Sequence, residues 1–175
     1  MAFAIEMFFD KDSEEKIYEM CRSFKRKGIN SLLDASDSKP HITLGIFNNF
    51  DMDKVEERIV QFSKSLSPFR LILGSIGTFP GKEGVLFLAP TVTNELLSIH
   101  DKFNNLFTEY QNEMWKYYQP GYWVPHCTLA INLSRKELQT AMDCILDSYT
   151  PKCITINELG VVEFYPVKLI KSYCI

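Results

Sequence analysis

The first half of the chain alternates between two hydrophobic periods, one typical of strands and one typical of helices. An apolar run at residues 2–9, interrupted only by Glu6, predicts a strand. Val55, Ile59 and Phe62 recur at the spacing of a single helix face and predict a helix around them. In chain order, the predicted elements are a strand at 2–9, a helix that ends at Gly28, a strand from Pro40, a helix near 52–65 and a strand at 69–79.

The second half of the chain repeats this order of elements. Leu96, Ile99 and Phe103 share one helix face, while Ser134 and Glu137 have the spacing of a capping box at the start of another helix. The predicted elements are a strand at 85–89 after a turn at 80–84, a helix from Thr91 or Thr93, a strand from Pro125, a helix from Ser134, and strands at 153–164 and 167–173. The final strand has no equivalent in the first half.

Two short segments of the predicted strands are nearly identical. Residues 40–46 read P-H-I-T-L-G-I and residues 125–131 read P-H-C-T-L-A-I, so five of seven positions agree. The chain has three histidines, and two of them, His41 and His126, take the same place in this repeat. Together with the repeated order of elements, this indicates an intertwined internal duplication.

The duplication predicts the fold class. We expect an α+β fold with two lobes, in which two mostly antiparallel sheets and their outer helices are related by a pseudo-twofold axis. Such symmetry places the two motif strands opposite each other across a central cleft. A chain of 175 residues suits one domain, so residues 1–175 are expected to form a single domain with motifs at 40–46 and 125–131.

Composition and charge limit the partners. The formal net charge of −3 and a pI near 5.6 give no basic field for long nucleic acid, so only a short or terminal ligand is expected. Five cysteines without a C-x-x-C pair favour reduced thiols and a cytoplasmic protein. No apolar run reaches the roughly 18 residues of a membrane span. We therefore expect a cytoplasmic monomer without a membrane partner.

The motif side chains point to a site. Because side chains alternate faces along a strand, His41 shares a face with Thr43, and His126 shares one with Thr128. A single strand histidine is often structural, but two in identical contexts favour a functional role; threonine is common in strands and is less specific. Neither motif contains a third zinc ligand, so no metal and no cofactor is expected. His100 has no repeat partner and is predicted on the solvated face of its helix.

The paired motifs H-I-T-L at 41–44 and H-C-T-L at 126–129 resemble those of the two-histidine (2H) phosphoesterase superfamily, in its 2′-5′ RNA ligase-like branch. The resemblance covers nearly the whole chain. It implies a bilobed fold with a cleft, and metal-independent phosphodiester chemistry on 2′-5′ or 2′,3′-cyclic linkages. A typical member has a basic residue directly after its second motif, where this sequence continues A-I-N-L.

The residue types agree with that chemistry. Opening a 2′,3′-cyclic phosphate needs a base on the incoming water and an acid on the leaving ribose oxygen, and His41 and His126 can supply both. The hydroxyls of Thr43 and Thr128 can donate to the nonbridging phosphate oxygens. The remaining candidates are Tyr122 and Trp123 for stacking on a base, and Lys39 and Lys82 as neighbours of the phosphate.

The expected function is that of a metal-independent phosphodiesterase acting on 2′,3′-cyclic phosphates of RNA ends or small nucleotides. The same site suits a 2′,5′-oligonucleotide phosphodiesterase or a 2′-5′ RNA ligase. An alternative of another class is a module that binds a terminal phosphate without turnover. Pseudo-symmetry leaves open which histidine is the acid and which is the base.

Overall fold

The computed structural model describes residues 2–31, 38–49, 51–79, 81–146, 149–164 and 167–175. Each strand and helix predicted from the hydrophobic pattern is present, and Pro80 of the predicted turn lies outside the described residues. The elements are β1 (Phe3–Phe9), α1 (Lys11–Lys25), β2 (His41–Phe47), α3 (Met52–Lys64), β3 (Phe69–Phe79), β4 (Gly84–Pro90), α4 (Asn94–Leu106), η1 (Thr108–Tyr110), η2 (Lys116–Tyr118), β5 (Cys127–Leu133), α5 (Arg135–Leu146), β6 (Lys152–Glu163) and β7 (Lys168–Cys174).

Side-chain caps fix where two of the helices begin. At α4, the hydroxyl of Thr93 accepts a hydrogen bond from the backbone N–H of Leu96 at 3.1 Å, so Thr93 is the cap. At α5, the backbone N–H of Ser134 donates to the Glu137 carboxylate at 2.8 Å, and the backbone N–H of Glu137 donates to the Ser134 hydroxyl at 3.3 Å. The predicted capping box is therefore confirmed, and a cap of this kind contributes about 1 kcal/mol.

All strand pairs in the sheet are antiparallel, and the strand order is β2-β1-β6-β3-β4-β5, with β7 paired to β6. If β1, β2 and β3 are exchanged with β4, β5 and β6, the order reads the same from the other end. The connectivity of the two halves is thus equivalent, and β7 is the additional strand.

The expectation of two separate sheets needs one correction, because the strands form a single continuous sheet. Residues 69–73 of β3 pair with residues 152–156 of β6, while the remainder of each strand pairs within its own lobe. These two strands are the longest of the sheet, with 11 and 12 residues. Their length lets each span both lobes, and this pairing joins the lobes. The α+β class and the antiparallel pairing are confirmed.

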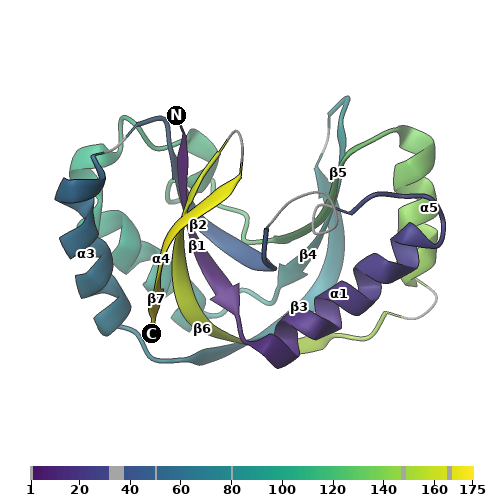
Figure 1. Cartoon of the computed structure of the whole chain (residues 1–175), viewed down its shortest axis with the longest axis horizontal. Helices are drawn as coiled ribbons and strands as arrows, with labels where there is room; N and C mark the ends of the chain where they lie inside the picture. The colour runs from purple at the N-terminus through teal and green to yellow at the C-terminus, as the bar shows by residue number, and fades with distance from the viewer. Residues whose placement is uncertain (1, 32–37, 50, 80, 147–148, 165–166) are drawn as a thin grey trace.

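The helices cover the sheet in two pairs. In Figure 1, α3 and α4 flank one side of the molecule, and α1 and α5 flank the other. Contacts between α3 and α4 and between α1 and α5 agree with this view. Each helix pair therefore combines one helix from each half of the sequence, as an intertwined duplication requires. No helix among the described residues has the length and apolar character needed to cross a membrane.

The inner faces of the motif strands anchor them in the core. Ile42 and Leu44 on β2, and Cys127 and Leu129 on β5, are fully buried. Burying a side chain of this size contributes about 1.5 to 3 kcal/mol, so the alternate face holding the histidines is rigidly supported. The predicted core positions of both motifs are confirmed, and Thr43 on β2 is buried as well.

Candidate active site

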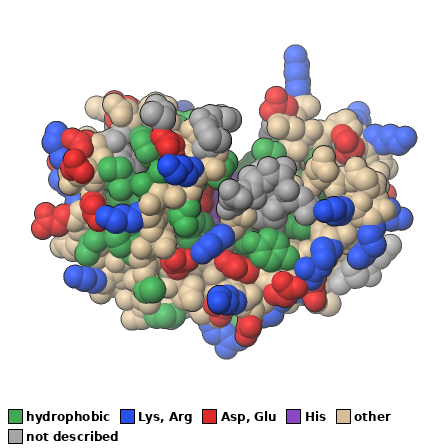
Figure 2. Space-filling model, in the orientation of Figure 1, with side chains coloured by type: hydrophobic (Ala, Val, Ile, Leu, Met, Phe, Trp, Pro, Cys, Tyr) green, Lys and Arg blue, Asp and Glu red, His purple; other side chains and the backbone are tan. Residues whose placement is uncertain are grey.

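The two motif strands are the two ends of the strand order β2-β1-β6-β3-β4-β5, and β2 and β5 nevertheless approach each other, with Cα atoms within 8 Å. The backbone amide of His41 donates a hydrogen bond to the Cys127 thiol. This hydrogen bond lowers the pKa of the thiol, but burial is the larger effect and raises the pKa to about 12. Since Cys127 follows His126 directly, this contact brings both histidines into one region, and the charge of His41 acts on the His126 ring. Figure 2 shows the surface hollowed between the part that carries α3 and α4 and the part that carries the β3–β4 hairpin.

The two imidazole rings are held in the same way. Nδ1 of His41 lies 2.7 Å from the carbonyl oxygen of Lys39, and Nδ1 of His126 lies 2.7 Å from that of Val124. In both cases Nδ1–H donates to the carbonyl two residues earlier, across the proline. The proton of the neutral ring is therefore assigned to Nδ1, and Nε2 is left to exchange a proton with a ligand. The P-H dipeptide thus supplies its own orienting acceptor.

A β-bulge follows the threonine in each motif strand. On β2, Thr43 pairs with Glu6 of β1. The neighbouring β1 residue, Ile5, pairs with Gly45, so the register skips Leu44. On β5, Thr128 pairs with Phe87 and Ala130 pairs with Leu86, so the register is shifted at the equivalent place. Bulges locally bend a strand and are frequent beside active sites. The hydrophobic pattern contains no sign of them.

The surroundings of His41 include a buried carboxylate. Oε1 of Glu6 lies 3.5 Å from Nε2 of His41, and the Glu6 side chain is almost fully buried. Burial raises the pKa of Glu6, and the charge of His41 lowers it. The ring of Phe8 also meets the His41 ring edge-on, at 6.4 Å between centroids. In the sequence, Glu6 stands out only as an interruption in an apolar strand, and this single charge in a buried strand was the available signal.

The surroundings of His126 are aromatic instead. Its ring centroid lies 4.9 Å from that of Phe79 and 5.2 Å from that of Phe87. Burial lowers the pKa of His126, the hydrogen bond to the Val124 carbonyl opposes this shift, and the charge of His41 adds to it. The neutral imidazole is therefore the favoured form of His126.

Trp123 and Tyr122 take different positions beside the motifs. Nε1–H of Trp123 donates to the carbonyl oxygen of Thr43 at 3.0 Å, which ties the indole to β2. One face of the indole stacks on His100, with centroids 3.9 Å apart and an interplanar angle of 5°. Tyr122 is half exposed, and the Lys116 ammonium group lies 4.5 Å from its ring centroid.

The prediction for His100 is wrong, because this side chain is buried with 3% exposure. Its Nε2 lies 2.9 Å from the carbonyl oxygen of Tyr118, and burial lowers its pKa. The aromatic connection after α4 folds back over the helix and covers it. This connection is fixed to the edge of β2, since the backbone N–H of Trp115 donates to the Ile46 carbonyl at 2.7 Å. A contact between segments so far apart has no local pattern.

The two candidate lysines differ in how they relate to the motif histidines. Nζ of Lys39 is 3.1 Å from a carboxylate oxygen of Glu158 and 5.2 Å from the ring centroid of Phe8. Lys82 is exposed in the β3–β4 turn, three residues beyond Phe79, whose ring contacts His126. Lys39 is therefore joined to the His41 surroundings, whereas Lys82 is placed near the His126 half only by its position in the chain.

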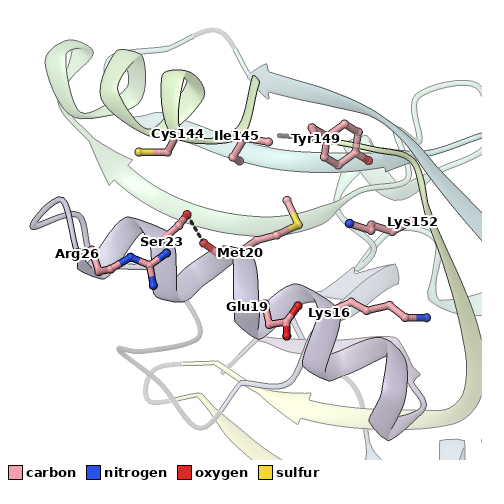
Figure 3. A pocket seen from close by; sticks show the side chains of 9 residues that line it. All are labelled: Lys16, Glu19, Met20, Ser23, Arg26, Cys144, Ile145, Tyr149 and Lys152. Carbon is pink, nitrogen blue, oxygen red and sulfur yellow. Dashed lines mark hydrogen bonds between the residues drawn. The ribbon is translucent and has the colours of Figure 1, made fainter. Parts of the chain in front are cut away.

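A surface pocket of about 210 Å³ lies between α1 and the segment from α5 to β6 (Figure 3). None of its lining residues belongs to a motif, and the ammonium group of Lys16 already donates to the Cys153 carbonyl at 3.1 Å. The lining residues of the pocket are Lys16, Glu19, Met20, Ser23, Arg26, Cys144, Ile145, Tyr149 and Lys152.

Across the described part of the chain, no group of three His, Cys, Asp or Glu side chains could hold a metal ion.

Comparisons with solved structures show a shared fold. The chain resembles E. coli LigT in its apo form with a TM-score of 0.65 and 12% identity, over 99% of this chain and 96% of that one. E. coli LigT complexed with 3′-AMP gives 0.63 and 13%, over 99% and 97%. TT0787 of Thermus thermophilus gives 0.66 and 15%, over 99% and 97%. A comparison with curated protein sequences gives no match.

The sequence itself matches the family model described as the 2′-5′ RNA ligase superfamily over residues 12–166. This range includes both motifs and all but the first and last strands. The match supports an enzyme that acts on phosphodiester bonds, and it confirms the resemblance to the 2H phosphoesterases. The chain belongs to the 2′-5′ RNA ligase superfamily.

Proposed function

We propose that this protein is a metal-independent phosphodiesterase that hydrolyses 2′,3′-cyclic phosphates on RNA ends or small nucleotides. The observation that carries the proposal is the matched pair of imidazoles. His41 and His126 are both oriented by a backbone carbonyl at 2.7 Å on Nδ1, which makes Nε2 the ring nitrogen for proton transfer; Nε2 of His41 also lies 3.5 Å from the Glu6 carboxylate. Two such groups are what an in-line displacement at phosphorus needs.

The reaction uses one histidine on each side of the phosphorus atom. A neutral imidazole takes a proton from water as the water oxygen forms its bond to phosphorus. The bond between phosphorus and one ribose oxygen breaks, and an imidazolium protonates that oxygen. Each transfer contributes about 10²- to 10⁴-fold to the rate. The two histidines end the turnover with exchanged protonation states, which solvent restores.

Thr43 and Thr128 lie two residues after the histidines, and their hydroxyls are proposed to donate to the nonbridging oxygens. Charge increases on these oxygens in the transition state, so fixed donors aimed at them are most effective there. Lys39 and Lys82 are proposed as further cationic neighbours. Trp123, fixed beside β2, and the half-exposed Tyr122 are proposed to contact the nucleobase.

The expected ligand is small. A net charge of −3 disfavours a long nucleic-acid track, so contact is proposed only with an RNA terminus or a small cyclic nucleotide. The complex of E. coli LigT with 3′-AMP supports this choice, because that ligand is a mononucleotide with a phosphate on the ribose. A cytoplasmic monomer is the form in which we propose that the protein acts.

A second candidate reaction uses the same groups in a different direction. If a ribose hydroxyl replaces water, paired histidines can join ends through a 2′-5′ linkage or reverse that step. The family description, which names RNA ligases, favours testing this reaction. A binding module that holds a terminal phosphate without turnover is the candidate of another class.

The test is to incubate the protein with the four 2′,3′-cyclic mononucleotides, 2′-5′-linked dinucleotides and cyclic-ended RNA, and to resolve the products chromatographically. We expect ring opening to a single phosphomonoester isomer, unchanged by EDTA, and its loss in His41→Ala and His126→Ala. Faster cleavage or joining of 2′-5′ linkages would select the alternative reaction. Tight binding of these ligands without any product would contradict the enzyme and favour the binding module.

A further inference from the structure

The two motif strands approach each other without being paired. Among the described residues, no strand ladder joins β2 to β5, and the hydrogen bond from the backbone amide of His41 to the Cys127 thiol is one direct link between them. Paired catalysis needs His41 and His126 at a fixed separation, because a displacement of about 1 Å can cost about 10²-fold in rate. The fold must therefore hold these strands by further contacts.

The segment that leads into the second motif is bound along the edge of the first motif strand. Nε1–H of Trp123 donates to the carbonyl oxygen of Thr43 at 3.0 Å, and the backbone N–H of Trp115 donates to β2 further along the same edge. Trp123 precedes His126 by three residues, and Thr43 follows His41 by two. The Trp123 indole therefore fixes the approach to one motif onto the strand of the other.

His100 holds this indole in place. Its ring stacks on the Trp123 indole, with centroids 3.9 Å apart and an interplanar angle of 5°. Nε2 of His100 lies 2.9 Å from the Tyr118 carbonyl oxygen, and the ring also has a hydrogen-bond contact with the Leu44 carbonyl of β2. The amide nitrogen of Asn104, one turn later on α4, lies 3.1 Å from the same Nε2. The imidazole is thus held from α4, β2 and η2 at once.

The equivalent helix of the other half has an aliphatic residue at this position. His100 is the seventh residue of α4, and the seventh residue of α1 is Ile17, which is fully buried. An aliphatic side chain is therefore sufficient for packing there. Burying an imidazole desolvates its polar ring, so a histidine is favoured over isoleucine only where its hydrogen bonds and its stacking are used.

We propose that His100 and Trp123 are positioning residues, which together form a clasp that fixes the second motif against the first and so sets the separation of His41 from His126. This inference rests on the proposed phosphodiesterase function and deepens it. The clasp acts through the backbone carbonyls of β2 to which these two side chains are bound, and it requires no contact between them and the reacting atoms.

Two variants weaken the clasp in different ways. Trp123→Phe keeps an aromatic ring against His100 and removes the N–H that donates to Thr43, whereas His100→Leu keeps an apolar filling, as at Ile17, and removes the hydrogen bonds. We expect each to lower kcat on a 2′,3′-cyclic mononucleotide by about 10- to 100-fold and to change KM by less than about threefold. His100→Gln retains a side-chain N–H donor and should recover part of the loss. Ile17→Val is the matched control and should keep the wild-type kcat.

The kinetics are measured at a temperature at which circular dichroism shows the variants folded. If His100→Leu does not fold, Trp123→Phe alone decides. A lower melting temperature with the wild-type kcat would show that the two side chains only pack, and would overturn the proposal. A KM that rises at unchanged kcat would overturn it as well, because the indole would then serve only to contact the nucleobase.

A measurement without substrate separates a failure of the clasp from a failure of the proposed function. The ring signals of His41 and His126 are followed by NMR, with assignments from His41→Gln and His126→Gln. In both clasp variants these signals should broaden, since the released strands sample several separations, and they should stay sharp in Ile17→Val. Sharp, unchanged signals in the clasp variants would overturn the clasp. Broadened signals together with no turnover in wild type would support the clasp and contradict the proposed function.

Discussion

The half-sites of His41 and His126 share the geometry of the repeated motif, and they differ in the side chains that pack against it. Both histidines follow a proline, both donate to the carbonyl two residues earlier, and both strands bulge after the threonine. The neighbouring strand then adds Glu6 on one side and Phe87 on the other. The repeated motif thus supplies the same reactive atoms twice, whereas the non-repeated neighbours give the two rings different surroundings.

This difference shows how a duplicated fold can support a reaction that is itself asymmetric. Hydrolysis needs one neutral and one protonated imidazole at the same time. Identical half-sites would leave the two singly protonated states equal in energy, so half of the molecules would be in the wrong state for a given substrate orientation. Glu6 beside His41 and Phe87 beside His126 make the two half-sites unequal.

The largest expected effect comes from removing either histidine. We expect His41→Ala and His126→Ala each to lower kcat by about 10²- to 10⁴-fold, because each removes one proton transfer. The double variant should fall little further, since the two groups act as a unit. Steady-state kinetics on a 2′,3′-cyclic mononucleotide measure this, with thermal melting as the control for folding. A kcat near wild type in either single variant contradicts the paired mechanism.

The threonines should have the next largest effect. Thr43→Val and Thr128→Val remove a hydroxyl that is proposed to meet developing negative charge, so kcat should fall by about 10- to 10³-fold while KM changes less. Valine keeps the β-branched shape, and Thr140→Val on α5, whose hydroxyl donates to the Lys136 carbonyl of its own helix, is the matched control. If KM rises while kcat is unchanged, the hydroxyls contribute only to ground-state binding.

The glycines behind the two half-sites are expected to be intolerant of a methyl group. A Cβ at Gly160 would lie 2.0 Å from the ring of Phe8, and one at Gly77 would lie 2.4 Å from the ring of Phe87. Displacing a packed ring costs about 1 to 3 kcal/mol, so Gly160→Ala and Gly77→Ala should each lower the free energy of unfolding by that amount. Denaturant titration measures it. Adding Phe8→Leu to Gly160→Ala should recover part of the loss, and no recovery would argue against ring displacement.

The smallest effect concerns stability and pH. Burial raises the pKa of Glu6 above its ordinary value of 4.5, so its protonated form stabilises the fold below that pH, and this contribution is lost as pH rises through the folded-state value. Gln does not titrate, so the melting temperature of Glu6→Gln relative to wild type should increase as pH rises from about 4.5.

Glu137→Gln provides a control of opposite sign for that measurement. Hydrogen bonds from Ser134 lower the pKa of Glu137 below its ordinary 4.5, so its carboxylate stabilises the fold above that pH, and the contribution is lost as pH falls. The Glu137→Gln variant should therefore melt at a lower temperature than wild type at neutral pH, and this difference should shrink as pH falls. A Glu6→Gln difference that does not change with pH would mean that Glu6 does not titrate in the folded protein.

Local patterns were sufficient for much of the fold and for the placement of the four motif residues at their strands. Strand alternation places Thr43 beside His41 without any tertiary information, and the capping box at Ser134 depends on residues three positions apart. The repeat then indicates which strands are equivalent. The alternation and the capping box use only residues that are neighbours in the sequence, and the repeat needs only a comparison of two short segments.

The missed features all depend on distant pairing. Joining the lobes into one sheet requires β3 to pair with β6, and the burial of His100 requires the segment after α4 to return over it. Glu6 becomes a neighbour of His41 only through the antiparallel register of β1 and β2. A charged residue in a buried strand almost never lacks a partner, so Glu6 was the residue from which such a contact could be inferred.

The pH dependence of kcat/KM for a 2′,3′-cyclic mononucleotide tests the paired-histidine mechanism most directly. The acid limb should reflect His126, whose pKa burial lowers below 6.5, because the base must be neutral. The alkaline limb should reflect deprotonation of the imidazole that acts as the acid. We expect a bell-shaped profile whose limbs lie within about two pH units of 6.5. A rate that stays constant from acid to alkaline pH would contradict catalysis by paired imidazoles.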